Sequence, residues 1–205
     1  MIEKGQGISN HKISRREFLR GALCLGAEYL LPPFEKFSQE RAIIDSIWQG
    51  KINPTLLEIE NYATGQIQVR NFNSTTQDWD PEYMPTFAWI HRISDNPSSF
   101  RGLFFIHRSN LLLAEKDRGQ IPPNTKMKIY AEFNHETPIL EARINFRAVY
   151  SANKIDTSTA PLAQLVAESQ RTIAIVTCHP PNYKEENPPQ RLVYFAWAFL
   201  PQTAN

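Results

Sequence analysis

The chain has 205 residues, which is enough for one domain of ordinary size and a leader. Hydrophobic residues make up 41%, so we expect a globular domain with a packed core rather than a disordered chain. The formal net charge is +1, which predicts neither a nucleic-acid-binding surface nor a polybasic membrane patch. The two cysteines, Cys24 and Cys178, lie in segments of different character.

Residues 1–33 have the charge order of an export signal. Residues 14–20 (SRREFLR) match the twin-arginine motif, and a short apolar stretch follows at residues 21–27. That stretch is far shorter than the roughly 20 residues that span a bilayer, so a stable transmembrane anchor is not expected. Leu23 precedes Cys24 where a lipoprotein site has a small residue. We expect export to the extracytoplasmic face of the membrane or the cell surface, with the N-terminus as at most a weak anchor; the alternative is an amphipathic N-terminal helix.

Residues 34–54 are predicted to be a helical lead-in. Apolar side chains recur at helical spacing from Phe34 to Trp48, and Gly50 is placed to end the helix. We expect this helix to lead into the domain or to pack on its outside. Asn53 and Pro54 mark the boundary with the domain proper, residues 55–205.

From residue 55 the pattern becomes that of short strands. Alternating or β-branched runs predict strands at residues 56–60, 66–70, 86–91, 102–107, 126–133, 137–150, 172–178 and 191–197. The first two should form a hairpin, and residues 71–85 a long loop. Residues 161–167 predict a helix, because Pro161 suits its first turn. The fold class expected is mainly β: a closed or nearly closed, antiparallel-rich barrel with one or two short helices in the crossovers.

The last two predicted strands carry a thiol and a guanidinium. Cys178 ends one strand, Arg191 begins the next, and a proline-rich loop joins them. If these strands are neighbours, both groups lie at the same end of one sheet. Cys24 falls in the leader, so Cys178 is the lone thiol of an exported domain and a candidate reactive group. The alternative is a buried core cysteine.

This pattern resembles the sortases, the cysteine transpeptidases of bacterial cell surfaces. The resemblance rests on Cys178 after Thr177, on Arg191 thirteen positions later, and on His107 at the end of an earlier strand. It covers roughly residues 56–200 and implies an eight-stranded, sortase-like closed β-barrel. The sequence departs from the family before the histidine, where Ile106 stands in place of the usual Gly, and at residues 122–125 (PPNT), which replace a Gly-Asp turn.

The resemblance also implies the chemistry. Cys178 is expected to be the nucleophile, His107 the general acid and base, and Arg191 the group that stabilises the oxyanion; Thr177 and Ala174 are expected to contact the substrate. A free cysteine has a pKa of about 8.5, so a thiolate requires nearby positive charge. The partners implied are surface proteins with a C-terminal sorting motif of the Leu-Pro-x-Thr-Gly kind and an amine from a cell-wall precursor or a pilin. No nucleic acid is expected.

Two histidines compete for the acid–base role. Residues 90–92 and 106–108 are both Ile-His-Arg. We favour His107, which is 71 residues before Cys178, over His91, which is 87 residues before it, because the shorter separation is nearer to that of the family. His179 adjoins the cysteine, but successive strand residues point to opposite faces, so it is a poor candidate.

Other functions are weighed against this one. A non-enzymatic extracellular β-barrel binding module with a degenerate sortase site would leave Cys178 inert. A papain-like enzyme needs a histidine well downstream of its cysteine, and the one histidine after Cys178 is its neighbour. The box typical of L,D-transpeptidases is absent. The histidines are scattered and no acidic cluster is present, so we expect neither a metal site nor a cofactor.

Residues 200–204 (LPQTA) have the form of a sorting pentapeptide with Ala in place of Gly. Coincidence is the favoured interpretation. The alternative is that this segment occupies the enzyme's own groove, or a neighbour's, as a weak autoinhibitor.

Overall fold

The computed structural model describes residues 34–81, 86–111, 120–131, 136–179 and 189–201, and the side chains from residue 39 onward. These residues belong to one compact unit, Pro32–Asn205. The expectations for residues 1–33, including the twin-arginine segment and Cys24, lie outside the described residues. Among the described helices, none is long and apolar enough to cross a membrane.

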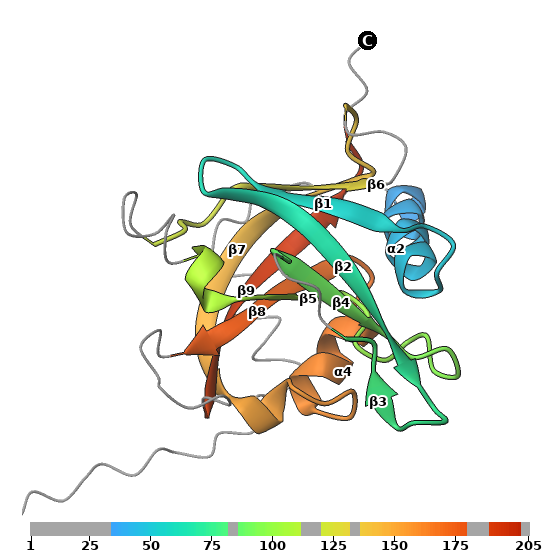
Figure 1. Ribbon diagram of the computed structural model, residues 1–205. Helices are drawn as coiled ribbons and strands as arrows, with labels where there is room; N and C mark the ends of the chain where they lie inside the picture. Colours follow the sequence, from blue (N-terminus) through green and yellow to red (C-terminus); the bar gives the residue numbers. More distant parts are fainter. Residues whose placement is uncertain (1–33, 82–85, 112–119, 132–135, 180–188, 202–205) are drawn as a thin grey trace, which may run out of the picture. The chain divides into compact units, whose positions relative to one another are not determined.

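The strands form one sheet that closes on itself (Figure 1). Their order is β1-β6-β7-β9-β8-β5-β4-β2-β3, and β1 also pairs with β2. β3 pairs with β2 beyond the closed part, so eight strands make the barrel and the predicted fold class is confirmed. The bounds are β1 Pro54–Ile59, β2 Ala63–Asn73, β3 Asp78–Trp79, β4 Ala88–Arg92, β5 Leu103–Ile106, β6 Lys126–Ala131, β7 Leu140–Ser151, β8 Thr172–His179 and β9 Gln190–Phe199.

Most neighbouring strands are antiparallel, as predicted, and two pairs are parallel. β1 and β2 form the expected hairpin. β2 with β4 and β5 with β8 run parallel, each joined through a longer connection. The second parallel pair matters for the site, because it places the C-terminal ends of β5 and β8 at the same edge of the sheet.

The predicted loop at residues 71–85 is partly a strand pair. β2 continues to Asn73, and β3 pairs back against it. The Asn73 side-chain oxygen accepts hydrogen bonds from the backbone N–H groups of the second and third residues after it (2.9 and 3.2 Å). The Asp80 carboxylate accepts two more from Asn71 (3.0 and 2.9 Å). Hydrogen bonds from polar side chains therefore stabilise this turn. Because the segment has no alternation of hydrophobic and polar residues, the sequence pattern does not predict the strand pair.

The lead-in helix is part of the core. α2 (Phe34–Trp48) ends in a Schellman turn, in which the Gly50 and Lys51 N–H groups donate to Ile47 O (3.3 Å) and Ser46 O (2.9 Å). Gly50 has φ of +76°, so its predicted place at the helix end is confirmed. Ile47 and Trp48 are buried with the inward-facing strand residues. The Trp48 ring meets the Phe104 ring edge-on at 5.4 Å.

The crossover from β7 to β8 covers part of the barrel's outer face. It contains the 3₁₀ turn η1 (Ala152–Lys154) and α4 (Pro161–Glu168), which begins with proline as predicted. α4 lies against β8, and its Val166 side chain reaches the backbone at Gly102. The Arg101 guanidinium donates to the carbonyls of Ala167 (3.0 Å) and Ser169 (2.7 Å) at the C-terminal end of α4. The crossover is thereby fixed to the start of β5.

Candidate active site

Three adjacent strands, β5, β8 and β9, bring the sequence-predicted residues to one edge of the sheet. Cys178 is directly opposite Arg191 in the antiparallel β8–β9 pair. The parallel β5–β8 pair ends with Phe105 opposite Val176. Counting on two residues along each strand places His107, just past the end of β5, level with Cys178. The structure therefore brings all three residues to the same edge.

The same three residues share one face of the sheet. On β8, Ile175 points into the barrel core, and Cys178 is an odd number of positions further on, so it points outward. On β9, Tyr194 points inward, so Arg191 points outward as well. Phe104 points inward on β5, which turns His107 to the outer face. Cys178 forms no disulfide and is half-buried.

Arg191 is held by a carboxylate that sequence reasoning missed. Its Nε donates to Asp156 Oδ1 (3.0 Å) and its Nη2 to Asp156 Oδ2 (2.5 Å), while Nη1 donates to Gln190 O (3.1 Å). Burial raises the pKa of Asp156 above its ordinary value, although the Arg191 guanidinium acts in the opposite direction. No motif marks Asp156, because it lies in an irregular segment 35 residues before Arg191.

His107 contacts an aromatic ring of the neighbouring strand. Its imidazole lies 4.8 Å from the Trp89 ring, measured between centroids, with the ring planes tilted by 47°. Trp89 is opposite Phe105 in the β4–β5 pair, and those two rings are stacked at 5.8 Å. The indole therefore limits the positions that the His107 ring can adopt.

The two Ile-His-Arg segments occupy opposite ends of neighbouring strands. β4 runs antiparallel to β5, with Ala88 opposite Ile106, so His91 lies toward the end of β5 remote from His107. The His91 ring is stacked on Trp79 at 4.1 Å and contacts Phe105 at 4.9 Å. Burial, followed by the nearby Arg70 guanidinium, lowers the pKa of His91 from 6.5 to about 3. His91 is thus a neutral packing residue away from Cys178.

The two residues predicted to contact the substrate, Thr177 and Ala174, are buried. Thr177 is only 2% exposed and points to the barrel side of β8, and Ala174 is fully buried beneath the crossover. The Ala174 N–H donates to Gly102 O (2.8 Å), so its place is structural. The expected substrate contacts of both residues remain a prediction. His179 lies opposite Gln190 rather than Arg191.

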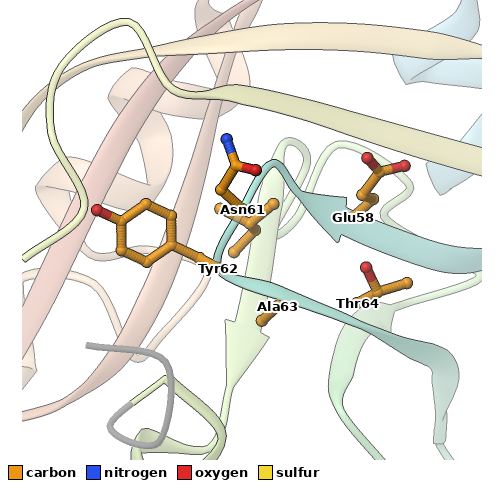
Figure 2. A pocket seen from close by; sticks show the side chains of 6 residues that line it. Glu58, Asn61, Tyr62, Ala63 and Thr64 are labelled. Carbon is orange, nitrogen blue, oxygen red and sulfur yellow. The ribbon is translucent and has the colours of Figure 1, made fainter. Parts of the chain in front are cut away.

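A surface hollow lies elsewhere, at the turn between β1 and β2 (Figure 2). It has a volume of about 280 Å³. Its lining consists of residues of that hairpin: Glu58, Ile59, Asn61, Tyr62, Ala63 and Thr64. The Glu58 carboxylate already accepts from the Tyr130 hydroxyl (2.7 Å) and the Lys128 ammonium (3.3 Å). The hollow shares no residue with the Cys178 site.

Three solved structures that match this chain are sortases. The crystal structure of the complex of Streptococcus agalactiae sortase C1 and MTSET matches with a TM-score of 0.50 and 9% identity, over 91% of this chain and 98% of that one. The chain has a sortase-like fold. At 9% identity this similarity establishes the fold alone, so the activity has to be argued from the site residues.

Two further sortase structures match less closely. Clostridium perfringens sortase C with the C-terminal cell wall sorting motif has a TM-score of 0.43 and 10% identity, covering 89% of this chain and 96% of that one. Sortase C1 of GBS Pilus Island 1 has a TM-score of 0.44 and 12% identity, covering 95% of this chain and 88% of that one. No family model and no curated protein matches the sequence.

Proposed function

We propose that the protein is a sortase-type cysteine transpeptidase. The observation that carries the proposal is the pairing of Cys178 with Arg191 across β8 and β9, with His107 level with them just past the end of β5. A nucleophile, a proton carrier and an oxyanion-stabilising cation are the groups that acyl transfer through a thioester requires. In the proposed site these three groups lie on the outer face of a barrel with sortase-like topology.

The proposed reaction has two halves. The Cys178 thiolate attacks the carbonyl carbon of the threonine in an LPXTG-like motif, and Arg191 donates hydrogen bonds to the oxyanion that forms. The C–N bond then breaks, His107 gives its proton to the leaving amine, and a thioester remains on Cys178. An incoming amine loses a proton to His107 and attacks the thioester. A new amide bond forms and the Cys178 thiolate is regenerated.

The proposal includes where the reaction takes place and with which partners. Residues 1–33 act as an export signal, residues 34–54 lead into the domain, and residues 55–205 carry the catalysis at the extracytoplasmic face of the membrane. The substrates are surface proteins with a sorting motif, and the acceptor is an amine of a cell-wall precursor or a pilin. The twin-arginine-like segment and the lone thiol of the domain support this assignment.

One observation favours a second candidate, a non-enzymatic extracellular barrel that binds peptide through a degenerate site. Asp156 already engages the guanidinium of Arg191, which offsets part of the positive charge beside Cys178. In a degenerate site this ion pair would serve only to stabilise the fold. The two candidates differ in whether Cys178 forms a covalent bond with the peptide.

The test is a transfer assay on the full chain with an LPXTG peptide and a triglycine acceptor, followed by mass spectrometry. We expect a transfer product that Cys178→Ala abolishes. Cys24→Ala, which removes the other thiol, is the matched control and should retain the activity. Peptide binding of equal affinity in wild type and Cys178→Ala, with no cleavage in either, would instead establish the binding module.

A further inference from the structure

Asp156 is anchored independently of the arginine that it contacts. Its backbone N–H donates to Ala152 O (2.9 Å), and the N–H of the fully buried Ile155 donates to the same carbonyl (3.1 Å). The Ala152 N–H in turn donates to Pro189 O (2.8 Å), two residues before Arg191. The carboxylate is therefore carried by a turn that is itself tied to the start of β9.

The contact between the two side chains fixes an orientation. Asp156 engages the Nε–Nη2 edge of the guanidinium with both oxygens, a bidentate geometry that defines the plane of the group. The bond from Nη1 to Gln190 O adds a third point (3.1 Å). Arginine otherwise retains large rotamer freedom, which would have to be lost at each turnover. A guanidinium held at three points loses that freedom before substrate arrives.

The ion pair is also sheltered from solvent. The Arg191 side chain is 12% exposed and the Asp156 side chain 30%. An exposed pair of this type contributes little, whereas a sheltered, bidentate one holds its geometry. The cost is that the carboxylate offsets part of the positive charge available to Cys178. Asp156 therefore has two opposing effects: it orients the Arg191 guanidinium, and it reduces the positive charge near Cys178. Mutation can separate these two effects.

We propose that Asp156 is a positioning residue, which holds the Arg191 guanidinium in the orientation that stabilises the oxyanion. The inference deepens the proposed function and rests on it. It assigns to the crossover between β7 and β8 a part in the chemistry in addition to covering the barrel. Asp156 does not itself touch the reacting atoms.

The test compares Asp156→Ala and Asp156→Asn in the full chain. Asp156→Ala removes the bidentate contact with the arginine, so kcat for peptide transfer should fall about 10-fold or more, while KM changes little. Asp156→Asn keeps the shape and one acceptor oxygen, and should recover part of that loss. Alkylation of Cys178 by iodoacetamide should not slow in either variant, because the net positive charge beside the thiol increases. A fall in transfer without a fall in alkylation is the signature of positioning.

Asp45→Ala is the matched control, because Asp45 pairs with the buried Arg101 away from Cys178. It should lower the melting temperature and leave kcat per folded molecule unchanged. If Asp156→Ala, like Asp45→Ala, leaves kcat per folded molecule unchanged, the positioning role is overturned. The proposed function still stands in that case, provided that transfer depends on Cys178 and Arg191. If the wild-type chain forms no thioester with peptide, the proposed function fails, and the inference fails with it.

Discussion

Cys178 and Arg191 face each other as directly paired residues of two antiparallel strands, on the outer face of the barrel. Their relationship is set by backbone register, so neither residue can shift along its strand without moving every inward-facing side chain of β8 and β9. A rigid pairing of this kind suits a site in which a charge must develop at a fixed point.

The first prediction concerns Arg191. Arg191→Ala should lower kcat for peptide transfer by about 10²- to 10³-fold, as loss of an oxyanion donor does elsewhere. Arg191→Lys keeps the positive charge but loses the planar, forked guanidinium, so its kcat should lie between the values for wild type and Arg191→Ala. Steady-state transfer assays on folded protein measure both. An Arg191→Ala variant with wild-type kcat would remove this residue from the mechanism.

The second prediction separates the two histidines. His107→Ala should slow transfer by about 10²- to 10⁴-fold, because proton transfer to the leaving amine is lost. His91→Phe should transfer at close to the wild-type rate near neutral pH, since its ring lies at the other end of the strand pair and serves packing. Equal losses in the two variants would show that His91 takes part in the chemistry.

The third prediction is an acid dependence of stability that comes from His91. Its pKa is about 3 in the folded chain against 6.5 in the unfolded chain. Between these values the unfolded chain binds the extra proton, so stability is lost as pH falls from 6.5 toward 3. From this residue alone, the free energy of unfolding should be about 2 kcal/mol lower at pH 5 than at pH 7.5.

Urea unfolding of wild type and His91→Phe at the two pH values measures that contribution. The variant keeps an aromatic ring against Trp79 and Phe105 but has no titrating group, so its stability should change less with pH. Identical pH profiles for wild type and His91→Phe would contradict the burial of a neutral imidazole.

The fourth prediction uses two glycines with similar backbone angles. Gly50 has φ of +76°, and a β-carbon added there would make only an ordinary van der Waals contact, with an Arg92 atom at 3.6 Å. Gly102 has φ of +82°, and a β-carbon there would lie 2.9 Å from Thr172 O and 2.9 Å from a Val166 methyl group. Gly50→Ala should cost about 1 to 2 kcal/mol, and Gly102→Ala about 1 to 3 kcal/mol more. Equal losses of unfolding free energy in the two variants, measured by urea unfolding, would contradict the close packing of Val166 and Thr172 against Gly102.

The fifth prediction concerns the LPQTA segment. β9 begins at the site and carries the chain away from it, so Phe199 lies roughly 26 Å along the strand from Arg191. Residues 202–205 lie outside the described residues. In the sequence Thr203 comes four residues after Phe199, and four residues of fully extended chain span at most about 14 Å. We therefore expect that the segment does not reach its own chain's site. Deleting residues 201–205 should leave the transfer rate of dilute protein unchanged, and a faster rate would contradict the reach argument.

Much of the fold was predictable because its signals are local. The helix from Phe34 to Trp48 has an apolar stripe and a glycine end, and α4 begins with Pro161. β8 and β9 are rich in β-branched residues and bounded by turn residues, so the predicted strand ends placed Cys178 and Arg191 to within a residue. What the pattern could not reveal was β3, whose turn is built by the polar side chains of Asn73 and Asp80.

The site was predictable only in part, for a related reason. His107 and His91 sit in near-identical local sequences. Their sequence separation from Cys178 favours His107, but the order and direction of the strands are needed to show which of them lies level with Cys178. Asp156 contacts Arg191 because tertiary packing brings an irregular turn next to β9. Such a turn has no periodic sequence pattern from which the contact could be predicted. Ala174 and Thr177 lie near Cys178 in sequence, but the alternation of the strand and the cover of the crossover bury both.

The most direct test of the account is intact-mass analysis of the full chain after brief exposure to a Leu-Pro-x-Thr chloromethyl ketone. Wild type, Arg191→Ala, His107→Ala and the Cys24→Ala control are compared. We predict a single adduct on Cys178 that forms rapidly in wild type and Cys24→Ala and slowly in the other two. An inert Cys178, or labelling that neither Arg191→Ala nor His107→Ala slows, would contradict the account and leave a sortase-like barrel without sortase chemistry.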